Sequence, residues 1–90
     1  MKLTIIPSDA AVYKDNYSYM QLDLSSANIP SDIHALQWDQ DKGWIEYTDE
    51  KYNLDITELP TWANVCVDIW QTAKTAEEEA AAAAAAAAAE

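Results

Sequence analysis

Residues 33–48 read IHALQWDQDKGWIEYT, and this stretch decides the fold. Its two flanks, 33–38 and 44–48, are rich in the aromatic and β-branched residues that strands favour. The five residues 39–43 between them are polar and typical of a turn. Gly43 is the only glycine of the protein, and we expect it to supply the positive φ that such a loop needs. The stretch therefore predicts a β-hairpin.

Two tryptophans border the loop of this hairpin. If Trp38 and Trp44 are paired across the strands, their contact contributes roughly 0.5–1 kcal/mol. Alternation along the first strand places His34 and Leu36 on the same face as Trp38. The sequence thus predicts a core hairpin built on Trp38 and Trp44, with Gly43 in its turn.

Shorter β-type runs precede the hairpin. Residues 3–6 predict a first strand, which the turn cluster at 7–9 ends with a proline. Residues 11–14 and 17–20 predict a second hairpin, because the Asp15-Asn16 pair between them tolerates left-handed backbone angles. We expect loops over residues 25–32 and 49–55, where polar and turn-forming side chains gather.

One long helix is predicted from Pro60 to the end of the chain, because proline suits a first helical position and no later proline or glycine interrupts it. At 1.5 Å per residue this helix is ~45 Å long, more than a small domain can cover. Its first half has an apolar face formed by Trp62, Val65, Cys66, Ile69, Trp70, Ala73 and Ala76. That face suits packing on a sheet, and its 4-3 spacing also suits the seam of a coiled coil.

The fold class expected from these elements is α+β, a small antiparallel β-meander and hairpin domain packed by one long C-terminal helix. Residues 1–76 form the compact domain with the packed start of the helix. Residues 77–90 form a helical extension rich in glutamate and alanine, with high helix propensity and few side chains that could build a core.

Charge narrows the range of partners. Sixteen carboxylates face five lysines and no arginine, which gives a net charge of −11. Such a surface repels phosphate groups, so we expect no direct binding to nucleic acid and none to an anionic membrane. The same field favours a basic partner protein, and it also serves solubility. A single cysteine, Cys66, excludes an internal disulfide and fits a small buried side chain. No secretory leader or membrane span is expected.

The chain has few residues of the types that carry out catalysis. The chain has one histidine and one cysteine, and no glycine-rich loop that could cradle a phosphate. Asp39, Asp41 and Glu46 resemble the start of a calcium loop only weakly, because the third ligand before the glycine is missing. We therefore expect a protein that is not an enzyme, with no catalytic residue, no metal site and no cofactor.

Tyrosine and tryptophan offer surface for binding. Nine such residues are more aromatic area than a small sheet with one helix readily hides, and both types are enriched at protein interfaces. The alternative is that they fill the core in place of phenylalanine, which is absent. The residues predicted to bind a partner protein are Tyr13, Tyr17, Tyr19, Tyr47, Trp62 and Trp70.

Three segments carry a resemblance to a known group of proteins. Residues 1–13 contain IIPSD followed by VY, residues 33–38 read IHALQW, and residues 43–47 read GWIEY. In these segments and in its helix rich in alanine and glutamate, the chain resembles small proteins encoded among the tail genes of tailed bacteriophages. The resemblance covers most of residues 1–75, and its motifs are structural.

This resemblance implies a structural or adaptor protein of a bacteriophage particle, connecting tail-fibre or baseplate parts. The partners it implies are other phage structural proteins and further copies of the chain, for which threefold fibres make a trimer one option. The implied location is the virion, after assembly in the host cytoplasm. One alternative is a tail-fibre assembly chaperone that binds and leaves. A second is an acidic inhibitor that mimics DNA by its array of carboxylates.

Overall fold

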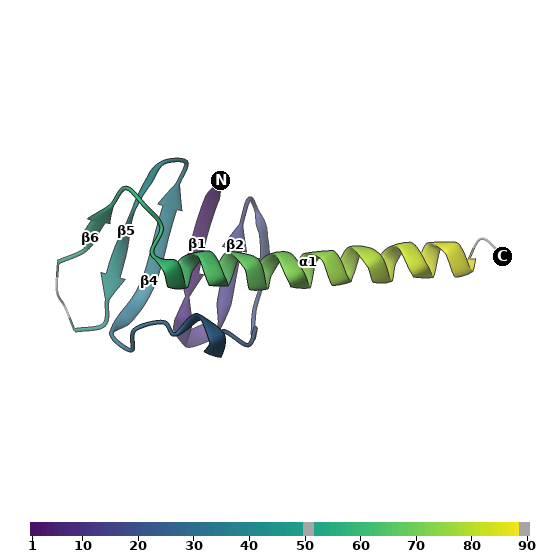
Figure 1. Cartoon of the computed structure of the whole chain (residues 1–90), viewed down its shortest axis with the longest axis horizontal. Helices are drawn as coiled ribbons and strands as arrows, with labels where there is room; N and C mark the ends of the chain where they lie inside the picture. The colour runs from purple at the N-terminus through teal and green to yellow at the C-terminus, as the bar shows by residue number, and fades with distance from the viewer. Residues whose placement is uncertain (50–51, 89–90) are drawn as a thin grey trace.

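A computed structural model of the chain describes residues 1–49 and 52–88. Six antiparallel strands form one sheet, and a single long helix lies across one face of it and continues beyond its edge (Figure 1). The predicted α+β fold, a sheet domain packed by one long C-terminal helix, is confirmed.

The elements follow one another along the chain with short connections. They are β1 (Lys2–Ile6), the 3-10 turn η1 (Pro7–Asp9), β2 (Ala11–Lys14), β3 (Tyr17–Tyr19), the 3-10 turn η2 (Ser25–Ala27), β4 (Ile33–Asp39), β5 (Lys42–Tyr47), β6 (Leu54–Ile56) and α1 (Thr61–Ala88).

The sheet consists of two three-stranded meanders joined side by side. Its strand order is β3-β2-β1-β4-β5-β6, so β1 pairs with β4 at the centre. In this pairing Leu3 lies opposite Trp38, and Ile5 lies opposite Leu36. The connection from β3 to β4 passes below the helix, where η2 contacts α1. A simple meander in chain order would have put β3 beside β4, and the observed order instead places the most apolar strands in the middle.

The hairpin predicted from residues 11–14 and 17–20 forms as the sequence predicts. Strands β2 and β3 are joined by Asp15 and Asn16, whose φ angles are 50° and 71°. Two positive φ values match the twist of a two-residue hairpin turn, and aspartate and asparagine adopt them at small cost. The Asp15 side chain also accepts a hydrogen bond from the amide of Lys2 at 2.9 Å. The turn is thereby tied to β1.

The hairpin of residues 33–48, formed by β4 and β5, has a tighter turn than predicted. Only Gln40 and Asp41 lie between the strands, and Gln40 carries the positive φ of 63°. The expectation of a positive φ at Gly43 is wrong. Glycine is required there for another reason, because a Cβ at this position would stand 2.1 Å from the carbonyl oxygen of Gln37. Gly43 thus permits a close approach of two backbones.

This shorter turn also changes the partners of the two tryptophans. Trp38 pairs with Gly43, and Trp44 pairs with Gln37, so the two indoles lie on opposite faces of the sheet. Trp38 is 8% exposed and belongs to the core, as predicted. Trp44 is 41% exposed, so its assignment to the core is wrong. The turn length decides the register, and the register decides which indole is buried.

A bulge near the start of β4 corrects a second expectation. The pairing with β5 shifts between Ile33 and Ala35, which leaves His34 as the extra residue. His34 is exposed, so it does not share the buried face with Leu36 and Trp38. The bulge lets Ile33 reach the core despite the break in alternation.

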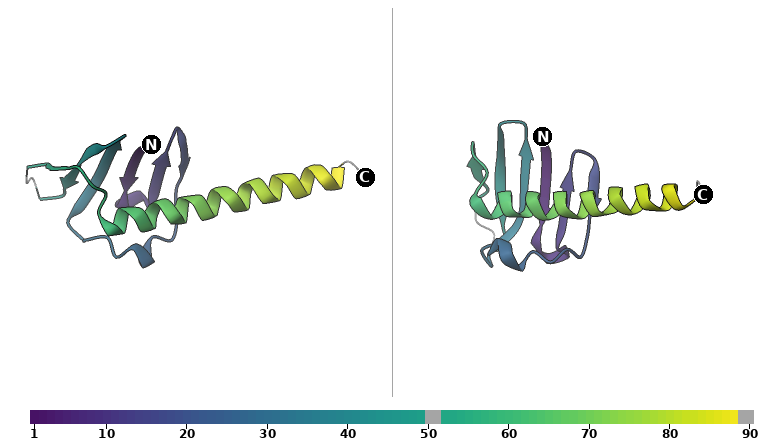
Figure 2. Two further views of the ribbon diagram at one scale, coloured as in Figure 1. Left: turned by 45° about the horizontal axis from the view of Figure 1, so that its top comes forward. Right: turned by 45° about the vertical axis from the view of Figure 1, so that its right-hand side comes forward.

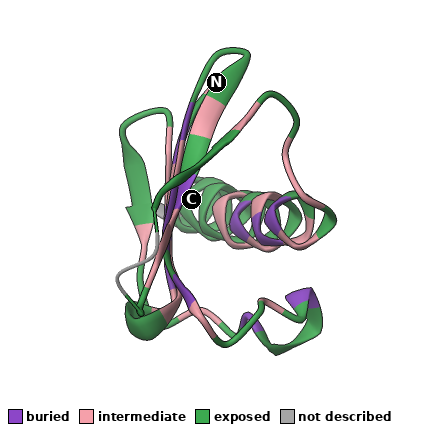
Figure 3. Cartoon of the chain, turned by 90° about the vertical axis from the view of Figure 1, so that its left-hand side faces the viewer, coloured by how far each residue is buried: buried purple, intermediate pink, exposed green. Residues whose placement is uncertain are grey.

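Helix α1 begins at Thr61, one residue later than predicted. The carbonyl oxygen of Pro60 accepts hydrogen bonds from the amides of Ala63, at 3.0 Å, and Asn64, at 3.2 Å. Pro60 therefore lies just before the first helical residue, and its carbonyl oxygen accepts the first hydrogen bonds of the helix. The helix face toward the sheet buries Ala63, Cys66 and Trp70. Figure 3 shows the helix end-on beside the sheet.

Strand β6 was not predicted. Leu54 and Asp55 fall in the region expected to be a polar loop, but both pair with β5, opposite Ile45 and Trp44 respectively. Residues 50–51 of that expected loop lie outside the described residues. A strand of three residues is too short to show a clear alternation of polar and apolar side chains. Its strand conformation depends instead on pairing with the neighbouring strand β5.

The core lies between the sheet and the first half of the helix. Its fully buried large side chains come from four different elements and are Leu3, Ile5, Val12, Leu36 and Cys66. Leu24 and Ala27, which lie in the β3–β4 connection, cover the lower edge of the core. Burial raises the pKa of the Cys66 thiol to about 11, so the thiol stays protonated near neutral pH.

Candidate functional site

The helix is fastened to the edge of the sheet at the point where it leaves the domain. Two tyrosines of β3 and one lysine of β2 meet a tryptophan, a lysine and a glutamate in the middle of α1 there. We call this group the aromatic clasp, and its members are Lys14, Tyr17, Tyr19, Trp70, Lys74 and Glu77. The spacing of two residues on β3, and of four and seven on the helix, puts five of them on facing surfaces. Lys14 shares the face of Tyr17 because the two residues pair across β2 and β3.

Hydrogen bonds hold the clasp together across nearly 60 residues of sequence. The hydroxyl of Tyr17 donates to Oε1 of Glu77 at 2.6 Å, and the hydroxyl of Tyr19 donates to Oε2 of the same carboxylate. The indole Nε1 of Trp70 donates to the backbone carbonyl of Tyr17 at 3.0 Å. This last bond ties the helix to the backbone of the edge strand β3.

Aromatic and cationic contacts add to these bonds. The rings of Tyr17 and Tyr19 meet the Trp70 ring edge-on, with centroids 6.4 Å and 6.2 Å away. The ammonium of Lys14 lies 4.5 Å from the centroid of Trp70, and that of Lys74 lies 4.4 Å from the centroid of Tyr17. Each geometry is attractive, because the faces of aromatic rings are electron-rich. The direction in which the helix leaves the sheet is therefore fixed by side chains.

The shared carboxylate alters the ionisation of the clasp. Hydrogen bonds from Tyr17 and Tyr19 lower the pKa of Glu77, because they stabilise its charged form. The hydrogen bond to Glu77 raises the pKa of Tyr17, and the pKa of Tyr19 is raised by desolvation and then by the same carboxylate. The phenols stay protonated and the carboxylate stays charged over a wide range of pH.

The clasp should consequently fail at acid pH. Since the folded-state pKa of Glu77 lies below its ordinary value of 4.5, its contribution is present above that value and is lost as the pH falls through the lowered pKa. We expect Glu77→Gln to lower the melting temperature at pH 7, and we expect this difference to shrink as the pH falls below 4.5. Thermal unfolding of both proteins at several pH values measures this difference.

The matched control is Glu78→Gln, which removes the neighbouring charge and its 3.3 Å ion pair with Lys74. That side chain is largely exposed, so its loss should change the melting temperature little at any pH. A difference between wild type and Glu77→Gln that does not shrink at any acid pH at which the protein still folds would contradict a charged clasp.

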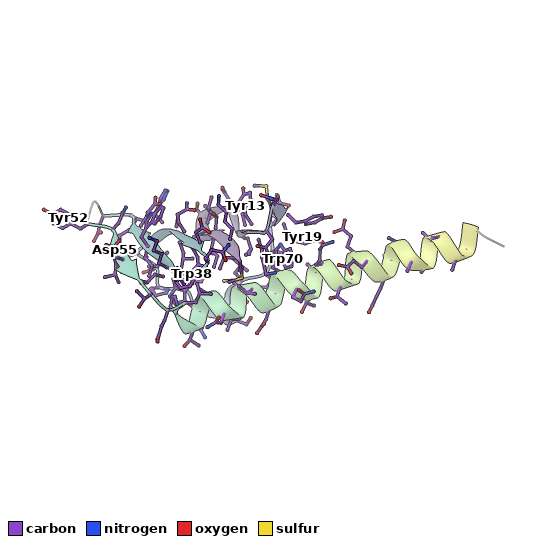
Figure 4. All side chains as sticks on the ribbon, turned by 90° about the horizontal axis from the view of Figure 1, so that it is seen from above. Tyr13, Tyr19, Trp38, Tyr52, Asp55 and Trp70 are labelled. Carbon is purple, nitrogen blue, oxygen red and sulfur yellow. The ribbon has the colours of Figure 1, made fainter. Side chains whose placement is uncertain are left out.

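The other face of the sheet carries no helix in the described part of the chain (Figure 3). One continuous row of paired residues crosses all six strands on this face, from β3 to β6: Ser18, Tyr13, Thr4, Gln37, Trp44 and Asp55. The hydroxyl of Thr4 donates to Oε1 of Gln37 at 2.7 Å in the middle of the row. Figure 4 shows Tyr13 on this far side, whereas Trp38 and Trp70 lie between the sheet and the helix. We call this surface the open face.

The second half of the helix makes the molecule elongated. The chain measures 57 × 25 × 18 Å, and the helix continues well past β3 (Figure 2). Residues 80–87 are alanines exposed on every side of the helix. They follow three glutamates, Glu77 to Glu79, of which only the first takes part in the clasp. We call residues 80–88 the projecting segment.

The predicted binding residues fall into different places. Tyr13 lies on the open face, and Tyr17 and Tyr19 belong to the clasp. Tyr47 and Trp62 are partly buried against the core. Trp70 is only 5% exposed, so its placement on a binding surface is wrong, because β3 covers it. Binding by the others stays a prediction.

Sequence reasoning missed some of the residues that define these surfaces. Trp44 was assigned to the core, and the lysines and Glu77 of the clasp were not singled out. The available signal was the spacing of Trp70, Lys74 and Glu77, which share a helix face, beside two tyrosines that share a strand face. Nothing local indicates that the two faces meet.

The described residues 1–49 and 52–88 show no group of three His, Cys, Asp or Glu side chains placed to hold a metal ion. Over the same ranges, no helix is both long and apolar enough to cross a membrane. Comparisons of the chain with protein-family models, with curated proteins and with solved structures find no match.

Proposed function

We propose that the protein is a non-enzymatic adaptor of a tailed-phage particle, in which the sheet domain docks on one tail-fibre or baseplate protein and the projecting segment binds another or bundles with copies of itself. The observation that carries this proposal is the course of α1, which completes the core with its first half and extends beyond the domain with its second. The resemblance to small proteins of phage tail genes supports it.

The projecting segment is suited to binding and not to folding. Its alanines carry no charge, and the described ones are exposed all around the helix. A helix that is apolar on every side is normally covered by other helices or by a protein surface. Alanine side chains allow a close approach between helices, so a partner helix could lie against any side of this one.

The clasp makes the adaptor stiff. Because Glu77 binds Tyr17 and Tyr19 at the sheet edge, the segment that follows it leaves the domain in a defined direction. Two proteins bound at the sheet and at the segment would then be held at a fixed distance and angle. A flexible linker would give no such geometry.

Truncation tests this proposal. A chain that ends at Glu79 keeps the clasp and should melt at nearly the same temperature as the full chain, because residues 80–87 are exposed and add no buried side chain. Supplied to a virus that lacks its own copy of the gene, this truncated chain should fail to enter particles. The measurement is the amount of the protein in purified particles.

The control for length replaces residues 80–90 with an equally long helix of alternating glutamate and lysine. It should also fail to enter particles if the apolar alanine surface is what binds. Normal incorporation of both the truncated and the replaced chain would contradict a role for the projecting segment.

A further inference from the structure

We propose that the open face around Trp44 docks a basic segment of a partner protein, with an arginine or lysine side chain of that segment stacked on the indole. The proposal specifies the chemistry of the partner that the sheet domain binds. It rests on the proposed adaptor function only for the role of that partner, and not for the binding itself. Three observations carry it: an exposed indole held in place, a hollow beside it, and the charge around both.

The indole of Trp44 is presented in a fixed orientation. Its ring is 41% exposed, and its Nε1 donates to Oε2 of Glu46 at 2.9 Å on the same strand. Gln37 flanks it on β4 and Asp55 flanks it on β6. A large aromatic side chain that is held still loses little entropy on binding, which is why tryptophan so often dominates interfaces.

A shallow hollow of about 480 Å³ lies beside this ring. Its polar side chains come from the ends of β4 and β5 next to their turn, from β6 and from the residue after β6. The residues that line it include Asp39, Lys42, Trp44, Asp55 and Thr57. The hollow is open to solvent and joins the ring to two carboxylates. One long side chain of a partner could lie along it with its charged end near the acids.

The charge around the hollow selects a cation. Three carboxylates, those of Asp39, Glu46 and Asp55, lie around Trp44. Two ammonium groups oppose them: that of Lys42 beside the hollow and that of Lys2, which lies opposite Asp39 on β1. One negative charge remains locally, in a chain of net charge −11. Phosphate and carboxylate ligands are therefore repelled. A guanidinium fits best, because its planar group stacks on an indole while its edge donates to carboxylates in pairs.

The test uses two short peptides that differ only in the end group of two side chains. Acetyl-Gly-Arg-Gly-Arg-Gly-amide presents the cation, and the same peptide with citrulline in place of arginine presents a neutral group of nearly equal shape. Each is titrated into the full-length, isotope-labelled chain while the indole N–H signal of Trp44 is followed by NMR. We expect a saturable shift with the arginine peptide and at least a fivefold weaker effect with the citrulline peptide.

Two variants and one control locate the interaction on the protein. Trp44→Leu keeps apolar bulk but removes the ring, so the backbone amide signals of β5 and β6 report binding for it. Asp55→Asn removes one carboxylate beside the ring. Each should weaken binding by about threefold to tenfold, as expected for one contact between a cation and a ring or carboxylate. The control Asp9→Asn makes the same charge change on η1, at the opposite ends of the strands from the β4–β5 turn, and should weaken binding less than twofold.

The remaining outcomes overturn the proposal. Equal binding of the two peptides would indicate a neutral, hydrogen-bonding ligand such as a glycan. Equal weakening by Asp9→Asn and Asp55→Asn would indicate only the general field of an acidic protein. Absence of binding by both peptides at millimolar concentration would also exclude the site. These results concern the isolated chain, so they are independent of whether it enters a phage particle.

Discussion

Replacing Trp38 with alanine is expected to lower the free energy of unfolding by about 3–5 kcal/mol, the range for large aromatic side chains removed from a core. Trp38 lies at the centre of the sheet, opposite Leu3 on β1, and its ring is covered by the helix. Its indole Nε1 also donates to the carbonyl of Gln40 at 3.2 Å in the β4–β5 turn. The substitution therefore leaves a cavity and loosens the turn.

Trp44→Ala is the matched control, because it removes the same side chain from the other face of the same hairpin. Its cost should be within about 0.5–1 kcal/mol, as for surface positions. Urea unfolding followed by circular dichroism measures both variants without relying on tryptophan fluorescence. Equal costs for Trp38→Ala and Trp44→Ala would mean that both indoles are in the core, and would contradict the register described above.

Trp70→Ala is expected to destabilise the protein by a similar amount, about 3–5 kcal/mol. The ring is buried between α1 and β3, and it contacts Tyr17, Tyr19 and the ammonium of Lys14. Its removal takes away both the last large core side chain of the helix and the centre of the clasp. Residues 74–88 should then be held less firmly and open more often, which faster hydrogen exchange of their amides measures.

Trp70→Phe separates packing from hydrogen bonding. Phenylalanine keeps most of the buried ring but has no donor for the carbonyl of Tyr17, so we expect a loss of about 1–2 kcal/mol. A cost of Trp70→Ala below 1 kcal/mol would show that the helix does not depend on this contact, and would contradict the clasp.

Local chemistry explains which parts of the fold could be predicted. Asp15 and Asn16 need only their own backbone preferences to make a two-residue turn, and that hairpin is where it was expected. The helix follows from the absence of proline and glycine after Pro60 and from one apolar face. Each of these signals lies within a single window of sequence, so no knowledge of the rest of the fold was needed.

The errors arose where distant residues decide the outcome. Residues 39–43 could form a loop of five residues or a turn of two, and the choice inverts the face on which Trp44 lies. The pairing of β4 with β1 settles it, since Trp38 must face the helix together with Leu3. Gly43 was recognised as special, but the carbonyl that it must approach belongs to a neighbouring strand.

The same limit applies to the candidate site. Tyr17 and Tyr19 attracted attention by their residue type, whereas Glu77 looked like one of three equivalent glutamates. Only the packing of α1 across the sheet brings this carboxylate to two phenols. The role of Trp44 on the open face likewise depends on which side of the sheet the helix covers.

The most direct test of the adaptor proposal is to quantify the protein by mass spectrometry in particles of the tailed phage to which the proposal assigns it, purified until soluble proteins are removed. An adaptor should be present at a fixed number of copies per tail, in constant ratio to the fibre or baseplate proteins. A protein found in the lysate of infected cells but not in the particles would contradict this proposal and would favour an assembly chaperone.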